Sequence, residues 1–125
     1  MTPTLCCTIA ALVTAVIDGD TIAVSASAWP GIEAVGLVRV IGIDTPELHG
    51  HCERERAAAQ AARDAAAALA PVGATVVLSE LGTDKYGRIL ARVRLADGRD
   101  LAAVLLAEGH GRPYAGGKRS GWCDE

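Results

Sequence analysis

The sequence contains few aromatic residues and no phenylalanine. Phe, Trp and Tyr together make up 3% of its 125 residues, whereas hydrophobic residues make up 50% and include many alanines. These numbers argue against a core of large rings and against a surface built from many stacked aromatic side chains. The apolar content still predicts a folded globular chain, with a core of small aliphatic side chains.

An excess of basic residues is also missing. The formal net charge is −3 at pH 7. Proteins that hold nucleic acid by neutralising many phosphates usually carry a basic face, so tight non-specific binding is not expected. A site that binds a single phosphate remains compatible with this charge, because a few arginines and a bound divalent cation make a small, locally positive pocket.

Long hydrophobic runs are absent too. The most apolar early stretch, Leu5–Val16, is too short to span a membrane, and no Lys or Arg precedes it. We therefore expect no membrane partner, and a protein that is cytoplasmic or exported by a route without an N-terminal signal peptide. The length suits one domain, so residues 1–125 are expected to form a single monomeric domain with a tail at 116–125.

Five segments rich in β-branched and small apolar residues predict strands, at 8–17, 21–27, 35–43, 75–81 and 89–95. Asp18-Gly19-Asp20 is a turn signal between the first two, which predicts a hairpin. Trp29-Pro30-Gly31 is expected to interrupt the pattern before the third strand.

Alanine dominates the segment 53–70, which predicts a long helix that Pro71 ends. The face expected to pack against the sheet consists of Ala58, Ala62, Ala65 and Leu69. A second, short helix is expected between an Asp100 N-cap and Gly109.

The order β-β-β-α-β-β-α matches an OB-fold in the α+β class, mainly β. That fold is a five-stranded Greek-key barrel, here with the long helix between strands three and four and the short one after strand five.

Two acidic clusters stand at predicted strand ends, at residues 18–20 and 44–47. In an antiparallel sheet they can meet, and carboxyl groups with a nearby backbone carbonyl favour Ca²⁺ or Mg²⁺ over zinc. The candidate ligands are Asp20, Asp44 and the Thr45 carbonyl. Taken alone, each cluster is more typical of an ordinary turn or strand end than of a metal site.

Three segments, Val16–Thr21, Val38–Glu47 and Asp84–Ala91, resemble the signature blocks of the staphylococcal-nuclease-like (thermonuclease) family and occur in the family's order. The resemblance extends from about Ala11 to Tyr114. The OB-fold that it implies agrees with the order of elements predicted above.

This resemblance implies a role for each matching residue. The implied calcium ligands are Asp20, Asp44 and Thr45, with Mg²⁺ as the less favoured ion. The implied catalytic residues are Glu47, which acts on water, and the phosphate-binding Arg39 and Arg88. The implied contacts to a neighbouring phosphate or base are Lys85, Tyr86 and Tyr114, while Asp18 supports the metal loop.

Some of these residues also allow a structural interpretation. Arg39 is either a phosphate ligand in a buried strand, as Val38 and Val40 suggest, or a strand arginine that reaches solvent. Tyr86 and Tyr114 either stack on bases or cover the rim of the barrel. Gly87 is expected to adopt a backbone geometry closed to other residues and so to direct Arg88 into the site.

The activity implied is calcium-dependent hydrolysis of phosphodiester bonds in DNA, RNA or both, with little base specificity and 3′-phosphate products. The alternative is a non-catalytic OB-fold module that binds nucleic acid or a protein. A third possibility is an enzyme that acts on another phosphodiester. Glu47 together with both arginines favours the enzyme, because a binding module has no need for this combination.

Cysteine is scarce, with four residues in the chain. A disulfide between Cys52 and Cys123 would tie the tail to the start of the long helix. A zinc site that adds His49 and His51 to this pair is the less favoured interpretation, because the spacing matches no common zinc motif. In the tail, Trp122 is expected to cap the barrel, and Lys118 and Arg119 to touch a nucleic-acid backbone.

Overall fold

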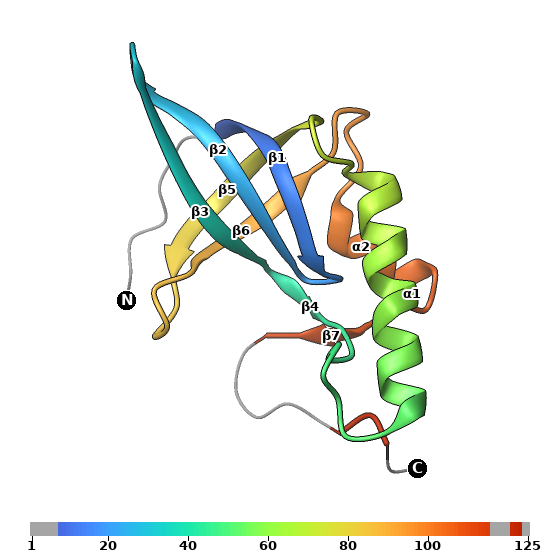
Figure 1. Ribbon diagram of the computed structural model, residues 1–125. Coiled ribbons are helices and arrows are strands. Elements are labelled where there is room, and N and C mark those ends of the chain that lie inside the picture. The colour runs from blue at the N-terminus through green and yellow to red at the C-terminus, as the bar shows by residue number, and fades with distance from the viewer. Residues whose placement is uncertain (1–7, 116–120, 124–125) are drawn as a thin grey trace.

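The computed structural model describes residues 8–115 and 121–123 (Figure 1). Cys6, Cys7, Lys118 and Arg119 therefore lie outside the described residues. The elements are β1 Ile9–Asp18, β2 Thr21–Trp29, β3 Ile32–Val40, β4 Gly42–Asp44, α1 Glu53–Leu69, β5 Thr75–Thr83, β6 Ile89–Arg94, α2 Leu101–Ala107 and β7 Arg112–Tyr114.

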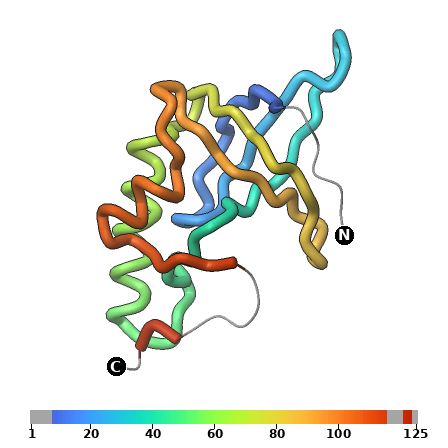
Figure 2. The backbone as a smooth tube through the Cα atoms, turned by 180° about the vertical axis from the view of Figure 1, so that it is seen from behind, coloured from blue at the N-terminus to red at the C-terminus, as the bar shows by residue number. Residues whose placement is uncertain are grey.

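Five of the strands close into a barrel in the order β1-β2-β3-β6-β5. All neighbours are antiparallel except β3 and β6, which run parallel and pair Arg39 with Leu90. The two helices lie on one side of the barrel, as the views from the front and from behind agree (Figures 1 and 2). The predicted class, a mainly β α+β fold of OB type, is confirmed.

The third predicted strand is divided in the structure. β3 ends at Val40, and β4 leaves the barrel to pair with β7 in a separate two-stranded sheet. Gly42 has φ +96°, a left-handed conformation that ordinary side chains rarely adopt and that breaks the strand. The prediction of one strand over 35–43 was therefore wrong, and the three-residue strand β7 was not predicted at all.

Pro30 and Gly31 break the strand pattern, as predicted, but the break is shorter than the sequence indicated, because the strands were expected to end at residue 27 and to resume at residue 35. β2 continues to Trp29 and β3 begins at Ile32, and these two residues pair with each other. Gly31 has φ +84°, so Pro30 and Gly31 form a tight turn that joins the strands. The resulting hairpin projects from the barrel (Figure 1).

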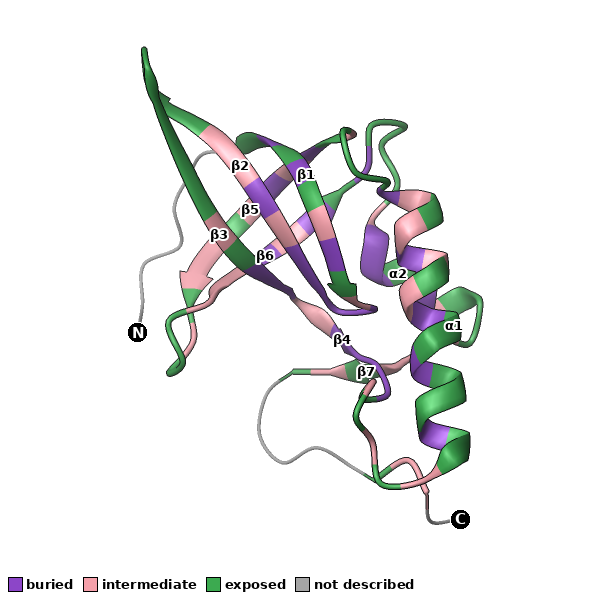
Figure 3. Ribbon diagram, in the orientation of Figure 1, coloured by how far each residue is buried: buried purple, intermediate pink, exposed green. Residues whose placement is uncertain are grey.

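Small aliphatic side chains fill the core, as their abundance predicted. Val13, Ile22, Val38 and Val93 are fully buried inside the barrel, and α2 adds Leu101 and Leu105, which are also fully buried. These residues belong to one continuous hydrophobic cluster. Buried positions alternate with more exposed ones along part of β1, as the burial colours show (Figure 3).

The long helix packs through a face that includes the predicted Ala62 but is rotated from the predicted one. Its buried residues are Glu55, Ala59, Ala62 and Ala66, whereas Ala58 is exposed. Ala65 and Leu69 are partly buried at the edge of the core. Because alanine occupies every side of this helix, hydrophobic periodicity could not define the buried face.

Within residues 8–115 and 121–123, neither helix has the length and apolarity needed to cross a membrane.

Candidate active site

The turn between β1 and β2 presents two acidic side chains at one end of the barrel. The backbone N–H of Asp20 donates a hydrogen bond of 3.2 Å to Asp18 Oδ1, which closes the turn. A Cβ placed on Gly19 would lie 2.9 Å from Cβ of Ala62 and 2.9 Å from Cγ2 of Thr45. The turn is thus pressed against α1 and against the chain after β4, with space for glycine alone.

The two acidic clusters meet, as the sequence predicted. The backbone N–H of Thr45 donates to Asp20 Oδ2 at 3.0 Å, and Thr21 Oγ1 donates to Asp20 Oδ1 at 3.2 Å. Asp20 is 6% exposed and Asp44 is 2% exposed. The carboxyl groups of Asp20 and Asp44 and the backbone of Thr45 are therefore gathered in one buried region at the end of the barrel.

Arg39 lies beside this acidic pair. Its Nη1 donates to the carbonyl oxygens of Val40 and Ile43, at 2.9 Å and 2.8 Å. Its Nη2 lies 3.5 Å from Asp20 Oδ2 and 3.8 Å from Asp44 Oδ1. The side chain is buried, so the prediction of a strand arginine held inside the protein is confirmed and the solvent-facing alternative is wrong.

The two carboxyl groups of the turn differ in their affinity for protons. Burial, together with the hydrogen bond to Asp20 and its negative charge, raises the pKa of Asp18 from 3.8 to about 7. Burial also acts to raise the pKa of Asp20. The hydrogen bond with Asp18, the charge of Arg39 and hydrogen bonds from Thr45 outweigh burial, and the pKa of Asp20 is lowered. Asp20 therefore loses its proton at a lower pH than Asp18 does.

The loop between β5 and β6 supplies the second arginine. Asp84 Oδ1 accepts hydrogen bonds from the backbone N–H groups of Tyr86 and Arg88, each at 2.9 Å, and Asp84 Oδ2 accepts one from Arg88 Nε at 2.8 Å. Gly87 has φ +81°, which confirms the predicted glycine geometry. The anchoring of the Arg88 guanidinium group by Asp84 was not predicted.

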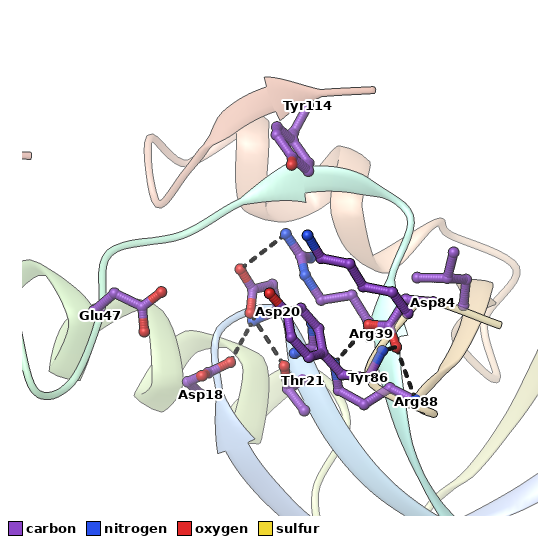
Figure 4. Close-up of a pocket in the computed structure, with 11 residues that line it drawn as sticks. Asp18, Asp20, Thr21, Arg39, Glu47, Asp84, Tyr86, Arg88 and Tyr114 are labelled. Atoms are coloured by element: carbon purple, nitrogen blue, oxygen red, sulfur yellow. Dashed lines mark hydrogen bonds and ion pairs between the residues drawn. The ribbon is translucent and has the colours of Figure 1, made fainter. Parts of the chain in front are cut away.

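These elements surround an open hollow of about 580 Å³. Its acidic lining residues are Asp18, Asp20, Glu47 and Asp84, and its basic ones are Arg39, Lys85 and Arg88. The remaining lining residues are Thr21, Leu90, Tyr86 and Tyr114. The Glu47 side chain points toward Asp18 and Asp20, and it lies on the side of the hollow away from Arg39 and Arg88 (Figure 4). Every predicted catalytic and substrate-binding residue lines this hollow, and Asp44 and Thr45 are buried next to Asp20.

Both tyrosines lie over cationic side chains. The Tyr114 ring is centred 5.7 Å from Arg39 Cζ, and the Tyr86 ring 5.7 Å from Arg88 Cζ and 5.3 Å from Lys85 Nζ. Tyr114 belongs to the unpredicted strand β7, which pairs it with Gly42. A smaller apolar cavity of about 270 Å³ adjoins Tyr114 and Leu90.

A disulfide joins Cys52 to Cys123, as the favoured interpretation of the cysteines predicted. This bond removes both thiolates that the zinc alternative requires.

Trp122 does not cap the barrel. Its ring packs against Arg112 of β7, with Arg112 Cζ 3.7 Å from the ring centroid.

One buried acidic residue near the hollow was missed. Glu55 is 4% exposed, and its carboxyl oxygens accept hydrogen bonds from the backbone N–H groups of Glu47 and His51. An acidic residue in the first turn of a helix is usually interpreted as a favourable charge at the helix N-terminus. The burial of this residue was the informative feature, and it depends on the tertiary fold.

A closed barrel of OB type is a fold that many proteins use to bind oligonucleotides or oligosaccharides, and a family match supports a nuclease-type or nucleic-acid-binding domain here. The chain belongs to the family of staphylococcal nuclease homologues, whose family model matches residues 37–120. The comparison with curated proteins gives no match. The matched residues include Arg39, Glu47 and Arg88, whereas the turn with Asp18 and Asp20 precedes them.

Proposed function

We propose that the protein is a calcium-dependent nuclease. It hydrolyses phosphodiester bonds of DNA, RNA or both, with little base specificity, and leaves 3′-phosphates. The observation that carries this proposal is the convergence of Asp20, Asp44 and Arg39 at one end of a hollow that Glu47 and Arg88 also line. Membership of the nuclease family supports it.

The donor set fits a hard divalent cation. Asp20 and Asp44 would supply buried carboxyl oxygens and Thr45 would supply a backbone carbonyl, and these residues belong to short chain segments that meet at the barrel end. Calcium prefers oxygen donors of this mixed kind. When bound, it supplies positive charge that polarises a phosphate oxygen and lowers the pKa of a water molecule.

Glu47 is the residue proposed to act on the attacking water. It lines the hollow on the side opposite Arg39 and Arg88 (Figure 4). A water molecule beside Glu47 can therefore approach a phosphate that the two arginines hold. Its carboxylate orients the water and accepts its proton as the bond to phosphorus forms. Asp18 supports the turn that holds Asp20 through the hydrogen bond from the Asp20 backbone.

Arg39 and Arg88 are proposed to bind the phosphate. A guanidinium group presents a planar set of donors that matches two phosphate oxygens, and the interaction strengthens as negative charge develops on them. Arg39 is held by two backbone carbonyls and Arg88 by Asp84, so both groups are oriented before substrate arrives. Such preorganisation lowers the cost of reaching the transition state.

The proposed contacts address phosphate and leave the base edges unread, which gives little base specificity. Lys85 is assigned to a neighbouring phosphate, and Tyr86 and Tyr114 to stacking on bases of any identity. Tyr86 is 73% exposed and therefore accessible to a base.

The test is degradation of single-stranded DNA, duplex DNA and RNA with Ca²⁺, with Mg²⁺ and with a chelator. Glu47→Gln and Arg88→Ala are compared with Arg99→Ala, an exposed arginine paired with Asp97 away from the hollow. The proposal predicts calcium-dependent cleavage by wild type and the control and strong loss in the two site variants. Intact substrate in every reaction, with oligonucleotide bound, would instead identify a non-catalytic binding module.

A further inference from the structure

Glu55 occupies an unusual place for an acidic residue. It lies in the first turn of α1 and is almost fully buried, although acidic side chains seldom leave solvent without a partner. Its Oε2 accepts a hydrogen bond of 3.2 Å from the backbone N–H of Glu47, and its Oε1 accepts one of 3.0 Å from the backbone N–H of His51. One carboxyl group thus binds two points of the loop between β4 and α1.

This loop carries Glu47, and Glu55 binds it at both sides of a turn. The Gly50 backbone N–H donates to the Glu47 carbonyl oxygen at 3.0 Å, which closes the turn that the Glu55 carboxyl group contacts. A Cβ on Gly50 would lie 2.3 Å from Glu55 Cδ. The loop is therefore packed directly onto the Glu55 side chain, and Gly50 is the residue that permits the close approach.

The contacts of Glu55 differ from those of an ordinary helix cap. In a capping box, an acidic residue at this position bonds the backbone N–H of the N-cap residue, which here is Cys52. The Glu55 side chain reaches past Cys52 to His51 and Glu47. Its own backbone N–H donates to the Cys52 sulfur, and Cys52 is bonded to Cys123. The helix start and the disulfide thus hold Glu55 in place while its carboxyl group holds the loop.

We propose that Glu55 is a positioning residue for Glu47, a role that rests on the nuclease function proposed above. By fixing the Glu47 backbone, Glu55 keeps the Glu47 carboxylate on the side of the hollow that faces Asp20. Arg39 and Arg88 belong to β3 and to the β5–β6 loop, so their hold on phosphate is independent of this contact. Loss of Glu55 therefore lowers kcat and leaves KM nearly unchanged.

The test compares Glu55→Gln with Glu53→Gln, an exposed acidic residue in the same helical turn. Glutamine keeps the shape of the side chain but has a single acceptor oxygen for two N–H donors. We expect Glu55→Gln to reduce kcat by roughly tenfold to a hundredfold, the cost of a small misplacement of a catalytic group. Glu53→Gln is expected to keep the wild-type kcat. Gly50→Ala, which displaces the Glu55 side chain, is a second variant with the same expected loss.

A double-mutant cycle separates positioning from a general structural role. In a Glu47→Gln background, Glu55→Gln is expected to reduce the residual kcat by less than about twofold, because the group that it positions is already gone. An equal reduction in both backgrounds, or a wild-type kcat in Glu55→Gln, would overturn the positioning role while the nuclease proposal stands. A wild-type protein without any cleavage would overturn both.

Amide hydrogen exchange gives a readout that needs no activity. Glu55→Gln is expected to accelerate exchange at the Glu47 and His51 amides and to leave the amide of Ile22 in the barrel core unchanged. Unchanged exchange at Glu47 would show that Glu55 does not fix this backbone, and the inference would fail. Acceleration at Ile22 to the same extent would show a global loss of stability and would also overturn it.

Discussion

Thr45 donates its backbone N–H to Asp20 Oδ2 at 3.0 Å, across a sequence separation of 25 residues. This hydrogen bond joins the turn after β1 to the chain after β4 and fixes the relative position of two acidic clusters. Arg39 lies against both of them. The cation site proposed here is thus assembled by the protein's own hydrogen bonds, which is the arrangement expected of a preorganised site.

Replacement of Asp20 tests the cation site. Asp20→Asn keeps the shape of the side chain but removes a negative charge, so we expect calcium affinity to fall by at least about tenfold. Isothermal titration calorimetry measures this directly. Asp97→Asn, in an exposed turn away from the hollow, is the matched control and should bind calcium as wild type does. Equal affinities in the two variants would remove Asp20 from the ligand set.

Arg88 tests the need for a guanidinium group. Arg88→Lys keeps the positive charge but lacks the planar fork that binds two phosphate oxygens. We expect kcat to fall by roughly a hundredfold to a thousandfold, as for loss of one transition-state donor. Steady-state kinetics on a single-stranded oligonucleotide measures it, with Arg99→Lys as control. Full activity of Arg88→Lys would mean that charge alone is sufficient at this position.

The disulfide predicts a dependence on redox conditions. Cys52 and Cys123 are 71 residues apart in sequence, and closing a loop of this length stabilises the folded chain by about 4 kcal/mol in the chain-entropy account. Reduction is expected to lower Tm, as measured by thermal unfolding with and without dithiothreitol. The Cys52→Ser, Cys123→Ser double variant should unfold at the same temperature in both conditions. An identical Tm for wild type in both buffers would indicate that the bond is absent or contributes nothing.

Asp18 predicts a pH dependence of stability in the presence of chelator. Its pKa is raised from 3.8 to about 7, so the folded state binds this proton more tightly than the unfolded state. The stability that the protonated group contributes is complete below about pH 4 and is lost as pH rises to about 7. Asp18→Asn cannot titrate, so the free energy of unfolding of wild type should fall relative to this variant over that range. Parallel curves from pH 4 to pH 8 would contradict the raised pKa.

Much of the barrel followed from the sequence because its signals are local. Segments rich in β-branched and small apolar residues indicated β1, β2, β5 and β6, and turns that contain glycine join β1 to β2 and β5 to β6. The division of β3 from β4 was missed because it depends on the conformation of Gly42, and the short strand β7 carries no periodic signal. The predicted face of α1 was correct at Ala62 but rotated from the buried one, because alanine on all sides of the helix gives no direction.

The candidate site shows the same division between local and tertiary information. Asp20, Asp44, Glu47 and Arg88 stand at turns or strand ends, where residue type and position indicate chemistry. The burial of Glu55 and its reach to Glu47 depend on how α1 docks, and one acidic residue among several in a helical turn gave no sign of it. Contacts of this kind are properties of the folded chain.

The most direct test of the central claim is end-group analysis of an oligonucleotide digested by wild type with Ca²⁺, beside Glu47→Gln. The account predicts 3′-phosphate products from wild type, no cleavage with chelator, and a rate reduced by at least about a hundredfold in Glu47→Gln. Equal cleavage by wild type and Glu47→Gln, or no cleavage by wild type in calcium, would contradict it.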